Sequence, residues 1–281
     1  MRNSSAQFWS QDLAGFVAAM TWFVALSARF FMVAALCDWL REVCYLFLPR
    51  RFPLDQPILI LGGFLITDEA YAPLALTLQS LTNQPVSVVH ASRLDWLLTS
   101  QSVGWTRLLD RVDKAVRSLR SISPTGFVTL IGHSSGGVML RPYLSHQRFV
   151  DRSYGGTDFC NRLITLGSPH QALRATSLRT MVCEQFPGCP ESESVDYISI
   201  AGELKLDSAN ASAFSRFTAG TSYRQISGDP KSIGDGLVPV SSAVLQGSFP
   251  VVLPNTAHGG FFGRHWYGSV DRVQEWWRAL L

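Results

Sequence analysis

The chain has 281 residues, of which 47% are hydrophobic and only 16% are charged, with a formal net charge of +3. A charged fraction below the roughly 25% of an ordinary soluble domain excludes intrinsic disorder and a collagen-like composition. The small net charge excludes a nucleic-acid binder that works through bulk positive charge.

The first 50 residues are far more apolar than the rest, because 33 of them are hydrophobic. The other 231 residues average roughly 43% hydrophobic, which is ordinary for a soluble domain. Residues 13–28 form an uncharged run, Arg29 interrupts it, and residues 30–37 continue it. A membrane span takes about 20 apolar residues, so residues 13–37 are long enough if Arg29 snorkels to the interface.

Three interpretations of residues 1–50 remain open. They are a membrane-attached segment that spans the membrane or lies in its plane, a docking helix that covers apolar surface of the body, and a cleaved signal peptide. Arg2 gives a signal peptide only a thin basic start, although Ala25-Leu26-Ser27 is an acceptable cleavage site. We favour membrane attachment, which places the protein on the cytoplasmic side of a membrane.

The five cysteines are Cys37, Cys44, Cys160, Cys183 and Cys189, so at least one of them is unpaired. No C-x-x-C pair exists, and we therefore predict no structural zinc site and no other metal. Cys183 and Cys189 are close enough in sequence to form a bridge across a loop. We favour small buried thiols instead, because the cysteine usage does not require an oxidising compartment.

From residue 53 onward, short β-rich apolar runs alternate with loops and helical stretches. This order predicts one domain built on a mostly parallel sheet with helices on both faces. The expected strands are residues 57–61, 86–89, 127–131, 163–166, 197–201 and 251–253. The expected helices are residues 68–81, 103–122, 138–144 and 270–281. Basic and acidic residues alternate along 103–122, which indicates a solvated helix face and not a nucleic-acid patch.

One motif follows the third expected strand. Gly132-His133-Ser134-Ser135-Gly136 fits the pattern G-x-S-x-G, which by itself is weak. A strand before it and a helix after it are the context of a nucleophile elbow, in which the serine occupies a tight, strained turn. A phosphate-binding loop is excluded, because Val138-Met139 stands where such a loop needs Lys and Ser or Thr.

A serine hydroxyl needs a base, and the base needs an orienting acid. In this arrangement they follow the serine in the order acid, then histidine. Asp235 lies between two glycines after the fifth expected strand, and His258 precedes two glycines after the last one. We predict Ser134 as the nucleophile, His258 as the base and Asp235 as the acid.

Four other residues compete with this assignment or surround it. Asp229 is the alternative acid and His265 the alternative base. His133, beside the serine, is interpreted as a scaffold residue. His170 is interpreted as part of a loop near the site.

An oxyanion hole needs two N–H donors. One should come from the residue after the nucleophile, which is Ser135. The other should come from the loop that follows the first strand of the body, Gly62-Gly63-Phe64-Leu65. We predict the N–H of Phe64 for this role, with that of Leu65 as the alternative.

Together, these motifs resemble the α/β-hydrolase superfamily. More narrowly, they resemble the lipase-like hydrolases of cyanobacteria and chloroplasts, which are related to bacterial triacylglycerol lipases and to the lipases that deacylate GPI inositol. The matching segments are residues 61–71, 131–137, 163–170, 234–243 and 257–269. The resemblance implies the α/β-hydrolase fold and a serine hydrolase of carboxylic esters without a cofactor, with its triad at Ser134, Asp235 and His258.

Two features depart from the family pattern. Gly62-Gly63 stands where many lipases carry His-Gly before the oxyanion residue. Pro142 falls early in the helix behind the nucleophile, which it is expected to kink or shorten.

The domain prediction is an apolar helical leader at residues 1–52 and a catalytic domain at residues 53–281. Residues 168–222 surround the fifth strand with long irregular stretches and are expected to form a small cap. Within or beside it, Phe186, Phe214 and Phe217 are candidates for an acyl pocket, although core packing is the commoner fate of such residues.

The expected reaction is hydrolysis of carboxylic esters through an acyl-enzyme, with lipid-like acyl esters as substrates because of the apolar leader. The expected partners are a small-molecule or lipid ester and a membrane surface, with no nucleic acid. Two alternatives stay open: an acyltransferase that uses the same three residues, and a non-catalytic binding protein on this fold.

Overall fold

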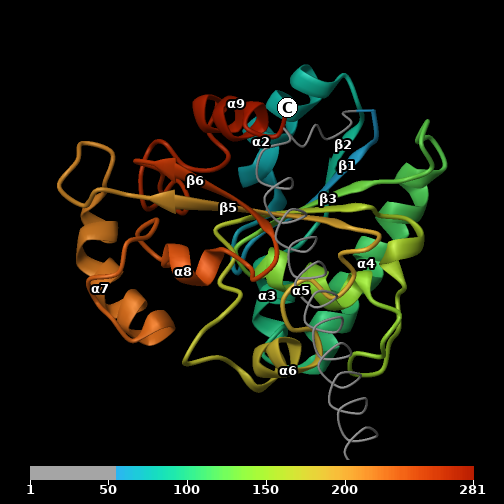
Figure 1. Cartoon of the computed structure of the whole chain (residues 1–281), viewed down its shortest axis with the longest axis horizontal. Coiled ribbons are helices and arrows are strands. Elements are labelled where there is room, and N and C mark those ends of the chain that lie inside the picture. Colours follow the sequence, from blue (N-terminus) through green and yellow to red (C-terminus); the bar gives the residue numbers. More distant parts are fainter. Residues whose placement is uncertain (1–54) are drawn as a thin grey trace, which may run out of the picture. The chain divides into compact units, whose positions relative to one another are not determined.

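The computed structural model describes residues 55–281, so the predicted leader at residues 1–52 lies outside the described residues. Six parallel strands form one sheet in the order β2-β1-β3-β4-β5-β6 (Figure 1). Their bounds are β1 Ile58–Leu61, β2 Val86–Val88, β3 Thr129–His133, β4 Arg162–Leu166, β5 Asp196–Glu203 and β6 Phe249–Pro254. Each expected strand is present within a few residues of its predicted place.

The chain runs from β1 to β2 on one side and then returns to β3 on the other side of β1. The carboxyl ends of β1 and β3 therefore flank a point where the strand order reverses, which is where open α/β sheets place ligands. The loop beginning at Gly62 follows β1, and Ser134 follows β3, so the topology brings these two predicted site elements together.

Ten helical segments between residues 55 and 281 surround the sheet. They are the 3-10 helices η1 Asp68–Tyr71 and η2 Gly156–Asp158, and the α-helices α2 Ala72–Thr82, α3 Arg93–Leu98, α4 Ser102–Arg120, α5 Ser135–Leu144, α6 Ser177–Gln185, α7 Ala213–Ser227, α8 Val240–Ala243 and α9 Val270–Arg278. Figure 1 shows α2 and α9 on one side of the sheet and α3 to α6 on the other. Within residues 55–281, no helix is long and apolar enough to cross a membrane.

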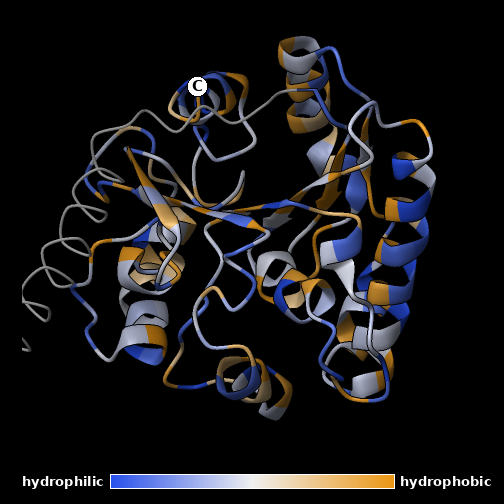
Figure 2. Cartoon of the chain, turned by 45° about the vertical axis from the view of Figure 1, so that its right-hand side comes forward, coloured by the Kyte–Doolittle hydropathy of each residue, from blue (hydrophilic) through white to orange (hydrophobic). Residues whose placement is uncertain are grey.

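Burial on both faces explains the uninterrupted apolar run of β1. Successive side chains of a strand point to opposite faces. Ile58 and Ile60 pack into the core beneath α2 and α9, whereas Leu59 and Leu61 pack into the core beneath α4 and α5. All four side chains are buried. Figure 2 shows mixed colour along surface helices such as α4, which bury one side only.

The structure corrects two expectations about helices. Helix α5 begins at Ser135, directly after the nucleophile candidate, so Pro142 lies late in it and not early, and the helix ends two residues after Pro142, at Leu144. Residues 168–222 are not irregular throughout, because they contain α6 and most of α7. These two helices bury few large apolar side chains, with Val182 in α6 and Ser215, Ala219 and Tyr223 in α7, so their sequences lack a strong apolar stripe.

Cys183 and Cys189 do not form a disulfide. Both are free thiols, as is the buried Cys160. The Cys183 Sγ donates to the carbonyl of His170 at 3.0 Å, and the Cys189 Sγ donates to the carbonyl of Gln246 at 3.3 Å.

Candidate active site

Ser134 occupies a strained turn between β3 and α5. Its backbone angles are φ 53° and ψ −124°, a region that residues other than glycine rarely adopt. The turn is held from the neighbouring strand, because the N–H of Ser134 donates to the carbonyl of Leu166 at 2.9 Å. The serine side chain therefore projects from the carboxyl end of a central strand, as a nucleophile elbow requires.

Two close backbone approaches explain the glycines of the motif. A Cβ at Gly132 would lie 2.3 Å from the Cα of Gly137, and a Cβ at Gly136 would lie 2.3 Å from the carbonyl oxygen of Gly62. Backbone atoms cannot move aside as a flexible side chain can. Any side chain at Gly132 or Gly136 would therefore open the turn that holds Ser134.

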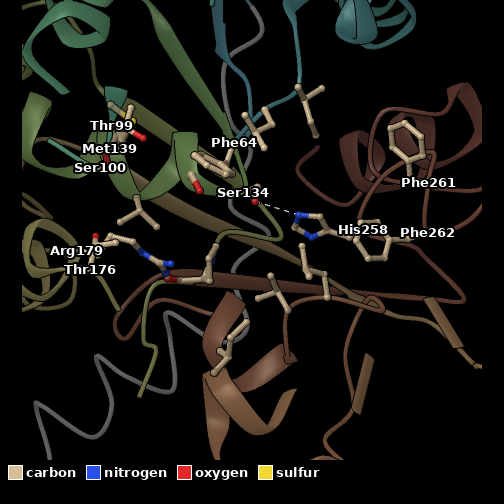
Figure 3. A pocket seen from close by; sticks show the side chains of 18 of the residues that line it. Phe64, Thr99, Ser100, Ser134, Met139, Thr176, Arg179, His258, Phe261 and Phe262 are labelled. Atoms are coloured by element: carbon tan, nitrogen blue, oxygen red, sulfur yellow. Dashed lines mark hydrogen bonds between the residues drawn. The ribbon is translucent and has the colours of Figure 1, made fainter. Parts of the chain in front are cut away.

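The structure brings the three predicted triad residues together. Ser134 Oγ lies 3.0 Å from His258 Nε2 (Figure 3), and His258 Nδ1 lies 2.8 Å from Asp235 Oδ2. The N–H of His258 also donates to the carbonyl of Asp235 at 2.8 Å, which ties the two loops to each other. Asp235 is fully buried, and His258 and Ser134 are 2% and 8% exposed.

Four donors surround the carboxylate of Asp235. Oδ1 accepts from the backbone N–H groups of Leu237 and Val238 at 3.0 and 2.7 Å. Oδ2 accepts from Nδ1 of His258 and from the hydroxyl of Tyr267, each at 2.8 Å. Because a carboxylate only accepts, Nδ1 of the neutral imidazole carries its proton and Nε2 is free to accept from Ser134. No pattern in the sequence indicates this role for Tyr267.

The alternative acid and base lie elsewhere. The exposed Asp229 accepts from the backbone N–H of Lys231 at 2.9 Å. The Nδ1 of His265 lies 2.7 Å from Asp271 Oδ2. Neither Asp229 nor His265 is hydrogen-bonded to Ser134 or His258 in the structure.

A chain of three hydrogen bonds runs behind the triad and is centred on His133, which is fully buried. Its Nε2 lies 2.8 Å from the carbonyl oxygen of His258, and its Nδ1 lies 2.7 Å from the hydroxyl oxygen of Tyr71. That hydroxyl in turn accepts the N–H of Gly63 at 2.7 Å. Since a carbonyl only accepts, Nε2 of the neutral ring carries the proton, and Nδ1 accepts from Tyr71. The chain connects the loop after β1 to the loop of His258.

Two buried histidines make the stability of the fold sensitive to acid. Burial lowers the pKa of His133 to about 3, with His258 as a smaller cause. Burial also lowers the pKa of His170 well below its usual value, and Arg141 and Arg179 add to this effect. Below about pH 6.5 the unfolded chain binds protons at these rings that the folded chain excludes, so stability falls as the pH falls.

We expect the free energy of unfolding to drop below about pH 6.5 by up to about 1.4 kcal/mol per pH unit for each of these histidines. Urea unfolding at several pH values would measure this slope. His133→Gln should make the slope shallower, whereas His146→Gln should not, because His146 is exposed. An equal slope in the native protein and in His133→Gln would contradict the expectation.

The loop after β1 contains two backbone N–H groups, those of Phe64 and Leu65, for which no acceptor is present within residues 55–281. The N–H of Gly63 is engaged by Tyr71, and the N–H of Ile66 donates to the carbonyl of Gly63 at 3.1 Å. Within residues 55–281, nothing accepts from the N–H groups of Phe64 and Ser135. The two predicted donors are therefore free to bind a ligand oxygen.

A cavity of about 890 Å³ opens at Ser134 and His258 (Figure 3). Most of its lining is hydrophobic, and it includes Phe64, Trp105, Met139, Phe214, Leu237 and Phe262. Of the three phenylalanines predicted for an acyl pocket, only Phe214 lines this cavity. Phe186 is 1% exposed in the core beneath α5, and Phe217 is 87% exposed on α7, so both expectations are wrong.

The solved structures that resemble this chain include Bacillus licheniformis lipase BlEst2 in two forms. The mature form matches with a TM-score of 0.53 and 16% identity over 80% of this chain and 91% of that one. The propeptide form matches with a TM-score of 0.51 and 16% identity over 80% of this chain and 49% of that one. No protein-family model and no curated protein matches the sequence. The parallel sheet, the turn at Ser134 and this likeness show that the chain has the α/β-hydrolase fold.

Proposed function

We propose that the protein is a serine hydrolase that cleaves carboxylic esters. The observation that carries this proposal is the continuous set of hydrogen bonds from Ser134 through His258 to Asp235, beside an apolar cavity that Ser134 and His258 line. A hydroxyl paired with an imidazole, which a buried carboxylate orients, is the arrangement that activates serine as a nucleophile.

The reaction follows from the geometry. His258 Nε2 takes the proton of Ser134 as Oγ attacks the ester carbonyl. The N–H groups of Phe64 and Ser135 bind the oxyanion that forms. His258 then gives the proton to the leaving alcohol, which leaves an acyl group on Ser134. Water loses a proton to His258, attacks this acyl group and releases the carboxylic acid, which restores the free serine.

Lipid-like acyl esters are the proposed substrates, since the cavity is lined mostly by hydrophobic side chains and its volume of about 890 Å³ can hold a hydrocarbon chain. The similarity in fold to a lipase supports this assignment, as does the resemblance of the motifs to the cyanobacterial and chloroplast lipase-like hydrolases. The apolar residues 1–50 supply the proposed attachment to the cytoplasmic side of a membrane.

A fluorophosphonate probe tests the proposal, because it reacts with an activated serine and with no ordinary hydroxyl. We expect the full-length protein to be labelled at Ser134 and Ser134→Ala to remain unlabelled. Ser100→Ala is the matched control, since Ser100 lines the same cavity but donates to the carbonyl of Leu97. This variant should label as the native protein does. Equal labelling of the native protein and Ser134→Ala would refute the proposal.

A further inference from the structure

The lining of the cavity at Ser134 contains one positively charged side chain. Among the lining residues within 55–281, Arg179 alone carries a permanent charge. It belongs to α6, and Figure 3 shows it on the opposite side of Ser134 from His258 in this view, with its guanidinium toward the cavity. The side chain therefore faces the same space into which a substrate of Ser134 would extend.

The hydrogen-bonding capacity of Arg179 is largely unused. Nη2 donates to the carbonyl of Pro169 at 2.5 Å, whereas the buried Nε has no partner. No carboxylate within residues 55–281 forms an ion pair with it. Burial lowers the pKa of its guanidinium, but arginine stays protonated in proteins near neutral pH.

A second arginine makes the charge imbalance larger. Arg141 of α5 is 2% exposed and donates to the carbonyl of Phe186, while its Nε and Nη1 have no partner. Burial lowers the pKa of His170, and the charges of Arg141 and Arg179 lower it further, so both cations lie near this buried ring. Within residues 55–281, no carboxylate forms an ion pair with Arg141.

Arg141 is buried and Arg179 half-buried, and a cation withdrawn from water without an anion is costly, because desolvation is not repaid by a partner charge. An anion that enters the cavity would restore the balance and would meet unused N–H donors of an arginine. Such charge-assisted hydrogen bonds are about twice as strong as neutral ones, and a planar guanidinium can bind a carboxylate or a phosphate through two of them.

We propose that Arg179 recognises an anionic group of the substrate, so that the ester cleaved at Ser134 carries a carboxylate or a phosphate away from the scissile bond. This inference rests on the proposed function, because it names the substrate class of the same site. The hydrophobic lining holds the hydrocarbon part of the substrate, and Arg179 binds its charged end.

Matched pairs of substrates test the proposal with the full-length protein. Each pair compares two substrates of equal chain length: the 4-nitrophenyl ester of a fatty acid, such as octanoic acid, and the mono-4-nitrophenyl ester of the corresponding dicarboxylic acid, such as suberic acid. Several chain lengths locate the distance from Ser134 at which the carboxylate reaches the arginine. A second arm compares acyl esters of glycerol with those of glycerol 3-phosphate, which separates a phosphate end from a carboxylate end.

The readout is the ratio of kcat/KM for the charged ester to that for its neutral partner, which cancels any general loss of activity. In Arg179→Gln we expect this ratio to fall by about 10- to 100-fold in at least one arm. Arg179→Lys keeps the charge and should retain part of the ratio. Arg174→Gln is the matched control, because Arg174 is exposed and does not line the cavity, and its ratio should equal the native one.

An unchanged ratio in Arg179→Gln in both arms would overturn the inference while leaving ester hydrolysis established by the neutral substrates. If the protein hydrolyses no ester, the proposed function fails. A binding measurement then still tests whether Arg179 recognises an anionic group. Calorimetry with Ser134→Ala should then show tighter binding of octanoate than of the uncharged 1-octanol, a preference that the added Arg179→Gln change removes. Equal binding of the acid and the alcohol would again overturn it.

Discussion

Asp235→Asn is expected to lower kcat for ester hydrolysis by about 10³- to 10⁴-fold while KM changes little. The reason lies in the donors around the carboxylate. Leu237 and Val238 direct two backbone N–H groups at Oδ1, so the oxygen of the substituted amide will face them. The NH₂ group is then left in the position of Oδ2, opposite Nδ1 of His258.

An NH₂ group donates where the carboxylate oxygen accepted, so it will bind the ring of His258 in the tautomer that carries the proton on Nε2. That tautomer cannot take the proton of Ser134. The fold should remain intact, since the amide has nearly the shape of the carboxylate. Hydrolysis of a 4-nitrophenyl ester, with circular dichroism to verify folding, measures the effect.

Asp229→Asn is the control for this experiment. Asp229 is exposed and bound to the N–H of Lys231, so its replacement should leave kcat within about twofold of the native value. A large loss in Asp229→Asn together with a small one in Asp235→Asn would reverse the assignment of the acid.

The fold could be predicted well where burial is two-sided. Strands such as β1 pack both faces against helices, so they appear in the sequence as unbroken apolar runs. Helix α4 could be predicted because Leu108, Val112 and Val116 recur on one buried face. Helices α6 and α7 could not, since their buried positions are few and are filled mainly by small side chains.

The candidate site was predictable where local backbone shape requires particular residues. The glycines around Ser134 mark a tight turn, and those beside Asp235 and His258 mark the loops that meet it. Tyr267 and Tyr71 lacked such a signal. The hydroxyl of Tyr267 meets Asp235, 32 residues away in the sequence, and that of Tyr71 meets His133, 62 residues away, so only the folded chain shows these contacts.

The chain of hydrogen bonds from Gly63 through Tyr71 and His133 to His258 leads to a second large expected effect. Tyr71→Phe leaves the N–H of Gly63 and the Nδ1 of His133 without partners. Each orphaned buried group costs about 1–3 kcal/mol, so we expect the free energy of unfolding to fall by about 2–6 kcal/mol. The loops of Phe64 and His258 also lose their shared support, and kcat should fall by about 10- to 100-fold.

A double-mutant cycle separates this positioning role from a general loss of stability. His133→Leu removes the next hydrogen bonds of the same series. The kcat of Tyr71→Phe combined with His133→Leu should therefore be only slightly lower than that of either single variant. His133→Gln keeps a donor for the carbonyl of His258 and should recover part of kcat. Tyr143→Phe is the control, because Tyr143 is also buried but makes only a 3.4 Å contact with Asp113. Two outcomes would contradict the positioning role. One is that the losses of kcat in the two single variants add up in the double variant. The other is that Tyr71→Phe, assayed well below its melting temperature, has the native kcat, which would show that these hydrogen bonds support only the fold.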